Sequence, residues 1–205
     1  MNSGATSQPS AVEPATLVLA SASPRRRELL EQVGLTPRIR PASIDERLVA
    51  GETPRDLVSR LAVEKCVAAG EMSDAREIVL AADTVIDRDG EVLGKPADEE
   101  DAVLMLLSLS GRRHEVHSGV CVRHVARGFA EWIVVTTKVQ FADITLAEAR
   151  RYAASGEPLG KAGAYAIQGR GARFVAGIEG SYSNVVGLPL FETLPLLEAA
   201  GLNLP

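Results

Sequence analysis

The sequence places charged side chains among apolar neighbours, where a charge needs a ligand or a partner. Asp83 lies inside 78–86, an apolar run typical of a strand that is covered on both faces. An ionised carboxylate in that setting is costly unless a metal, a cation or a reacting water compensates it. Lys65 lies on the apolar stripe of a helix expected over 53–70, so its ammonium must reach solvent or meet an anion. Both residues are candidates for chemistry, and the alternatives are a structural ion pair and a solvent-reaching lysine.

The hairpin after Asp83 indicates which cation this carboxylate meets. Arg88-Asp89-Gly90 fits a three-residue loop with glycine in the left-handed conformation. That register places Lys95 directly opposite Asp83 on the same face of the hairpin. A two-residue loop would pair Lys95 with Thr84 instead. We expect the three-residue loop, with Asp83 and Lys95 as a polar pair in an apolar layer.

A second group of charges, at 21–27, favours an anion site. A short strand over 17–20 runs into a helix with Ser23 as N-cap and Pro24 at its first position. Arg25 and Arg26 then lie in the first turn, where a positive charge opposes the helix dipole. Bound phosphates would offset that repulsion and accept hydrogen bonds from the free N–H groups. We favour phosphate binding over the alternative, a solvated basic helix end.

Strand-like and helix-like segments alternate along the chain, which predicts an α/β fold with a mixed sheet. The expected strands cover 17–20, 78–86, 91–94, 115–124 and 132–141, and the expected helices cover 24–33, 54–70, 98–109 and 146–154. A last helix begins near Pro189, and Pro195 should kink or restart it. The first 15 residues are small and polar and are typical of a disordered tail, so we expect one domain over 16–205.

The composition excludes several classes of protein. The 205 residues are 46% hydrophobic and 24% charged, which is typical of a globular chain. There is no apolar run of membrane-spanning length and no export signal, so we expect a cytoplasmic protein without membrane contacts. A net charge of −5 and 4% aromatic residues argue against binding a nucleic acid polymer.

The number and spacing of the cysteines and histidines do not indicate a metal site. Cys66 and Cys121 are too few to form a disulfide framework. His114, His117 and His124 fall in one stretch, and we interpret them as solvated strand positions because we find no carboxylate or thiol at matching spacing.

Six motifs occur in one order along the chain: SASPRRRELL, LAVEKC, AADTVI, LGKP, GEPLGKAGAYAIQGRGARFV and GSYSNVVGLPL. Over about 17–202 they resemble the Maf (septum formation) family of nucleoside triphosphate pyrophosphatases. The resemblance implies an elongated, two-lobed fold with a twisted mixed sheet, flanking helices and a central cleft, similar to that of inosine triphosphatases. It also implies hydrolysis between the α- and β-phosphates of a nucleoside triphosphate with Mg²⁺ or Mn²⁺, and a homodimer.

The same resemblance implies a role for each site residue. Asp83 would take the proton of the attacking water, and Glu46, in Ser43-Ile44-Asp45-Glu46, would join it near the metal. Phosphate or base would be held by Ser21, Arg25 and Arg26. The phosphate chain would be bound by Lys65 and Lys95. Taken alone, Glu46 looks like an ordinary loop carboxylate.

Three positions imply a preference among substrates. Arg25, Thr84 and Gln168 match the family branch that acts on dTTP and UTP, whereas the 7-methyl-GTP branch carries other residues there. A glutamine amide can both donate and accept hydrogen bonds at a pyrimidine edge. Gly160 is a departure, because the branch usually has aspartate before Lys161. Gly160 favours one alternative, a nucleotide-binding regulator of cell division with little turnover. A second alternative, a 7-methyl-GTP pyrophosphatase, is disfavoured by the three matching positions.

Overall fold

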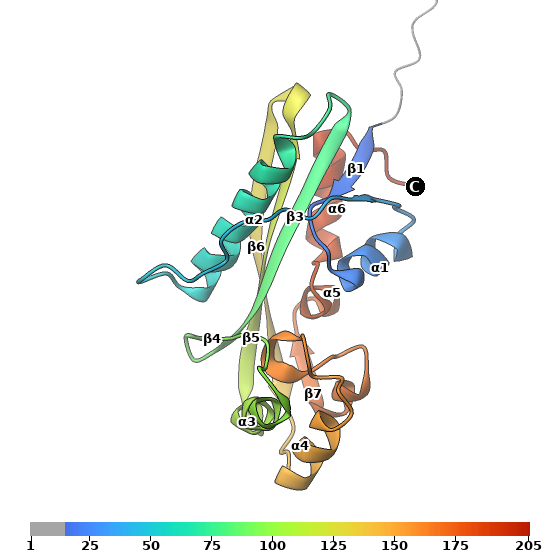
Figure 1. Cartoon of the computed structure of the whole chain (residues 1–205). Helices are drawn as coiled ribbons and strands as arrows, with labels where there is room; N and C mark the ends of the chain where they lie inside the picture. Colours follow the sequence, from blue (N-terminus) through green and yellow to red (C-terminus); the bar gives the residue numbers. More distant parts are fainter. Residues whose placement is uncertain (1–14) are drawn as a thin grey trace, which may run out of the picture.

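The computed structural model describes residues 15–205 and arranges them around a seven-stranded mixed sheet (Figure 1). The strands are β1 (Thr16–Leu19), β2 (Arg38–Ile39), β3 (Glu77–Arg88), β4 (Glu91–Leu93), β5 (Arg113–His124), β6 (Phe129–Phe141) and β7 (Val175–Glu179). Their order is β2-β1-β3-β5-β6-β7, with β4 also paired to β3. Because β1 runs parallel to β2 and β3 while the other pairs are antiparallel, the predicted mixed sheet is confirmed. The tail expected over 1–15 lies outside the described residues, except for Ala15.

Six α-helices flank the sheet in this part of the chain: α1 (Pro24–Gln32), α2 (Pro54–Gly70), α3 (Glu99–Leu109), α4 (Leu146–Ala153), α5 (Tyr182–Val186) and α6 (Leu190–Ala200). In one half of the molecule α2 lies on one side of the sheet and α1 and α6 on the other, whereas α3 and α4 lie at the opposite end (Figure 1). The long strands β5 and β6 run through both halves and give the molecule its elongated, two-lobed shape. None of the described helices is long and apolar enough to cross a membrane.

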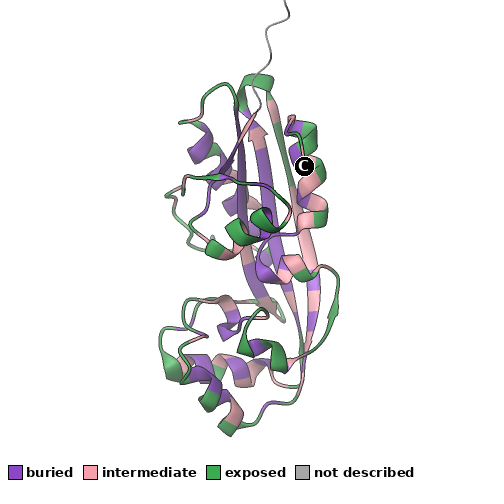
Figure 2. Cartoon of the chain, turned by 90° about the vertical axis from the view of Figure 1, so that its right-hand side faces the viewer, coloured by how far each residue is buried: buried purple, intermediate pink, exposed green. Residues whose placement is uncertain are grey.

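Side chains alternate between the two faces of β3, as a strand requires. Val79, Ala81 and Val85 pack under α2, whereas Ile78 and Leu80 face α1 and α6. The lobe with α3 and α4 has its own apolar cluster. Figure 2 shows the buried strands between partly exposed helices. Asp83 shares the alternation of Val79 and Ala81, so the fold turns it toward α2.

A glycine lets α2 approach the sheet at the level of Asp83. Gly119 on β5 is the cross-strand partner of Asp83. A Cβ atom there would lie only 2.0 Å from the carbonyl oxygen of Val58 on α2, so no other residue fits without moving the helix backbone. This close packing brings the side chains of α2 within reach of Asp83.

The predicted hairpin register is wrong. The observed pairs, Ile86 with Leu93 and Arg88 with Glu91, belong to a two-residue loop. Asp89 and Gly90 both have positive φ, as a type I′ turn requires, and this turn matches the twist of the strands. The strand β4 ends at Leu93, so Lys95 lies in the following loop and is no cross-strand partner of Asp83.

The histidines also differ from the prediction of solvated positions. All three are buried: Tyr165 contacts His114, α6 contacts His124, and His117 lies between Thr136 and Asp87. The expectation of no carboxylate at matching spacing is also wrong, because Glu115 Oε2 lies 3.6 Å from His117 Nε2. Near the C-terminus, α6 continues through Pro195 as one element and does not restart. The short elements β2, β7 and α5 were absent from the sequence-based prediction, since two to five residues carry little periodicity.

Candidate active site

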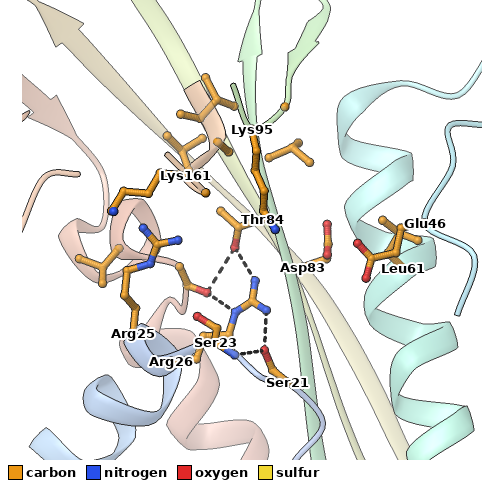
Figure 3. Close-up of a pocket in the computed structure, with 18 of the residues that line it drawn as sticks. Ser21, Ser23, Arg25, Arg26, Glu46, Leu61, Asp83, Thr84, Lys95 and Lys161 are labelled. Atoms are coloured by element: carbon orange, nitrogen blue, oxygen red, sulfur yellow. Dashed lines mark hydrogen bonds between the residues drawn. The ribbon is translucent and has the colours of Figure 1, made fainter. Parts of the chain in front are cut away.

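A gap along one edge of β3 opens into the main cleft. The strand β1 pairs with that edge up to Leu80, and β4 pairs with it from Ile86 onward. Between them, neither strand pairs with 81–85, so side chains from both faces of β3 reach the same opening. The cleft has a volume of about 900 Å³, and both lobes contribute to its walls (Figure 3).

Asp83 and Lys65 form a buried ion pair on the α2 side of the cleft. The Lys65 Nζ atom lies 2.6 Å from Asp83 Oδ1 and 2.8 Å from Glu46 Oε1. Asp83 and Lys65 are 8% and 7% exposed, so little water screens this pair, whereas Glu46 is on the exposed loop before α2. Lys65 therefore supplies the cation that the sequence analysis had assigned to Lys95. Two carboxylates converging on one point are also a donor set for a divalent cation.

Arg26 links three segments that are far apart in the sequence. Its guanidinium donates to Ser21 Oγ (3.0 Å), to Thr84 Oγ1 (3.1 Å) and to the carbonyl oxygen of Gly187 (2.9 Å) (Figure 3). Burial lowers the pKa of Arg26, the nearby charge of Arg25 lowers it further, and Asp83 opposes both effects. An arginine stays charged through such a shift, so Arg26 holds a fixed positive charge in the cleft wall.

The other cations of the cleft come from three separate segments. Arg25 projects from the first turn of α1, and Lys161 lies near it in the close-up (Figure 3). Lys95 points from the loop after β4 toward Thr84 and Asp83 (Figure 3). Lys161 Nζ donates to the carbonyl oxygen of Glu157 (2.6 Å). In the sequence, Lys161 is notable only as the neighbour of Gly160, and its place in the GEPLGKAG motif is the signal that could have identified it.

The remaining predicted positions lie on the same cleft. Gln168 and Gly160 line it from the segment after α4. Gly160 has a φ of +76°, and no atom lies within 4 Å of the position that a Cβ would take. Thr84 is engaged in the wall, because its hydroxyl contacts Ser118 (2.8 Å) in addition to Arg26. The structure thus gathers every candidate site residue around one opening, including Glu46.

This arrangement suits attack by water on a phosphorylated ligand. A buried acid lies beside a lysine on one wall, and positive side chains lie on the facing walls. In addition, the first-turn N–H groups of α1 have no acceptor within the helix. The chemistry available is proton transfer to a carboxylate together with neutralisation of several negative charges.

Comparisons with known proteins agree with the sequence motifs. The family model described as Maf-like protein matches residues 16–200. A dTTP/UTP pyrophosphatase of Anaeromyxobacter dehalogenans (strain 2CP-C) is 57% identical over 191 residues, which cover 92% of this chain and 96% of that protein. A dTTP/UTP pyrophosphatase of Vibrio cholerae serotype O1 is 48% identical over 181 residues, which cover 88% of this chain and 96% of that protein.

Among solved structures, a HAM1 protein from Coxiella burnetii aligns with a TM-score of 0.45 and 16% identity, over 63% of this chain and 74% of that one. The family model spans nearly the whole described chain, and the relatives share about half of its residues along almost their full length. The chain therefore belongs to the family of Maf-like proteins.

Proposed function

We propose that this protein is a nucleoside triphosphate pyrophosphatase that hydrolyses dTTP and UTP to the monophosphate and pyrophosphate. The observation that carries the proposal is the cleft in which the buried acid Asp83 lies across from positive side chains of both lobes. The printed function of relatives at 48% and 57% identity supports the choice of substrate.

Asp83 is the proton acceptor in this proposal. Lys65 donates a hydrogen bond to Oδ1 and thereby fixes the carboxylate, and this leaves Oδ2 to take a proton from water as the water attacks phosphorus. The bond from the α-phosphorus to the bridging oxygen then breaks, and pyrophosphate leaves. The positive charges of Arg25, Lys95 and Lys161 stabilise the negative charge that develops on the phosphate oxygens.

Arg26 has a positioning role in addition to binding. Three of the five N–H donors of its guanidinium hold Ser21, Thr84 and Gly187 in place, which leaves two for a phosphate oxygen. Gln168 lies at the cleft rim, where its amide would both donate to and accept from a pyrimidine base.

The residues fit a divalent cation such as Mg²⁺ or Mn²⁺. Asp83 and Glu46 bring carboxylate oxygens to within 2.8 Å of one ammonium nitrogen, and oxygen ligands are the ones these ions prefer. Asp83 and Glu46 would hold the ion, which would supply further positive charge to the triphosphate.

Phosphate release from the purified protein tests the proposal. The nucleotides are dTTP, UTP, CTP, GTP, ATP and 7-methyl-GTP, each with Mg²⁺ or Mn²⁺, and each with and without added inorganic pyrophosphatase. We expect a signal with dTTP and UTP that requires the added enzyme. Direct phosphate release would mean cleavage at the terminal phosphate and would contradict the mechanism. No turnover of any nucleotide, with binding retained, would favour the regulator instead.

A further inference from the structure

A second cluster of charged side chains lies outside the main cleft. Asp87 on β3 and Glu115 on β5 are cross-strand partners, and His117 lies two residues further along β5 on the same face. The His117 Nε2 atom is 3.1 Å from Asp87 Oδ2 and 3.6 Å from Glu115 Oε2. One ligand atom from each residue lies within 4.8 Å of the other two. We call these three residues the sheet-face triad.

The spacing of the triad suits a metal ion. Ligand atoms around a four-coordinate zinc, at about 2.0–2.1 Å from the metal, stand about 3.3 Å from one another. Both distances from His117 Nε2 are close to that value. One imidazole and two carboxylates are a donor set that Zn²⁺ and similar transition metals accept, with water in the open position.

His117 is already oriented as a metal-binding histidine would be. Its Nδ1 atom lies 2.9 Å from Thr136 Oγ1, so a hydrogen bond on that side leaves Nε2 directed at the two carboxylates. The ring is buried, and Thr136 is held in turn by a hydrogen bond from Arg55 at the start of α2. A ligand whose far nitrogen is fixed in this way loses little freedom on binding.

The two carboxylates of the triad are partly exposed to solvent, whereas His117 is buried behind them. The residues of the triad lie beyond the first turn of α2, where the helix no longer covers this face of the sheet. A cavity of about 400 Å³ opens there, with Asp87 and Glu115 in its wall and Arg113 and Lys138 beside them. Lys138 also pairs with Glu179 (3.6 Å), so the positive charges near the cavity are partly engaged elsewhere.

We propose that the sheet-face triad is a binding site for a divalent transition-metal ion, with Zn²⁺ as the expected occupant. Asp87 follows Asp83 by four residues on β3, a separation of roughly 13 Å along a strand, so this site is separate from the cleft. A bound ion links β3 to β5 next to the hairpin whose far end leads to Lys95. The alternative is a direct hydrogen bond between His117 Nε2 and Asp87 Oδ2 with no metal between them.

Calorimetric titration of the full-length protein with Zn²⁺ tests the proposal, without nucleotide and in a buffer that does not bind zinc. We expect a binding equivalent that His117→Gln and Glu115→Gln weaken by at least about 10-fold, the lower end of the cost of losing even an outer partner of a ligand. Asp89→Asn is the matched control, because Asp89 lines the same cavity outside the triad. Glu46→Gln removes a carboxylate of the cleft and should leave this equivalent intact.

Cobalt gives a second readout that does not depend on heat. We expect Co²⁺ bound to the wild-type protein to give visible absorption bands that zinc displaces and that are lost in Glu115→Gln, a change at a half-exposed position that the fold should tolerate. The proposal is overturned if zinc does not bind, if binding is unchanged in both triad variants, or if only Glu46→Gln removes it.

Discussion

Two carboxylates on the same strand and the same face have opposite surroundings. Asp83 is buried and paired with the ammonium of Lys65, whereas Asp87 is half-buried and paired with the imidazole of His117. An ammonium group has no lone pair to offer a metal ion, whereas an imidazole nitrogen is a common metal ligand. The helix α2 causes the difference. It covers the sheet at Asp83, but its N-terminal end stops short of Asp87. The same strand thus offers one carboxylate whose partner can only donate hydrogen bonds and one whose partner can itself bind a metal ion.

Replacing Asp83 should produce the largest effect. It should also distinguish the role of Asp83 from that of Asp89, a carboxylate on the same hairpin. Asp83→Asn removes the proton acceptor but keeps the shape of the side chain. We expect kcat for dTTP and UTP to fall by about 10²–10⁴-fold, the usual contribution of a general base. Equilibrium binding of the nucleotide should remain. Asp89→Asn, an exposed change on the same hairpin, should keep full activity. Equal activity of Asp83→Asn and the wild type would remove Asp83 from the mechanism.

Lys65→Met tests whether the ion pair between Lys65 and Asp83 also stabilises the folded protein. The substitution leaves Asp83 without its cation in a nearly dry position, so we expect the free energy of unfolding in urea to fall by about 3–5 kcal/mol. In the double variant Lys65→Met/Asp83→Asn, most of that loss should be recovered, because no buried charge remains unpaired. An undiminished free energy of unfolding in the single variant would show that water reaches Asp83 freely.

The sequence predicts the surroundings of Asp83 only in part. The strand, the helix α2 and the position of Lys65 on the apolar stripe follow from local apolar patterns and from the Thr53-Pro54 start, and the structure confirms them. Whether the ammonium reaches solvent or meets an anion does not follow from the pattern. The pairing of Lys65 with Asp83 does not follow, because it depends on how closely α2 packs on Gly119. The predicted partner Lys95 was wrong because of a single residue of turn length.

The sheet-face triad shows a second limit of sequence patterns. Alternation places Glu115 and His117 on one face, but their meeting with Asp87 depends on the pairing of β3 with β5 across a connection that includes α3. Such register is a property of the folded sheet. Glu46 is a similar case, since a loop carboxylate shows no periodicity and only the family resemblance pointed to it.

His114 provides the contrast to His117 on the other face of β5. It packs between Phe141 and Tyr165, and burial lowers its pKa to about 4. In the unfolded chain it binds a proton near pH 6.5, so stability is lost as the pH falls from about 6.5 toward 4, by up to about 3 kcal/mol. Urea unfolding at pH 7 and pH 4.5 should show this loss in the wild type and a smaller one in His114→Gln. Equal pH dependence of the two proteins would contradict a neutral buried His114.

Gly160 allows the smallest test, by adding a third carboxylate to the cleft. Aspartate is among the residues that tolerate positive φ, and open space surrounds the position, so we expect Gly160→Asp to cost about 1 kcal/mol or less. The new charge lies next to Lys161, whose ammonium already donates to a carbonyl oxygen, so kcat/KM should change by less than about 10-fold, or 1.4 kcal/mol. Gly160→Asn is the control, because it has the same shape without the charge. If Gly160→Asp gained turnover far beyond that limit and Gly160→Asn did not, the wild-type cleft would lack a catalytic charge. A fixed lysine beside Asp83 would then be insufficient for efficient hydrolysis, and the regulator would become the better interpretation of this chain.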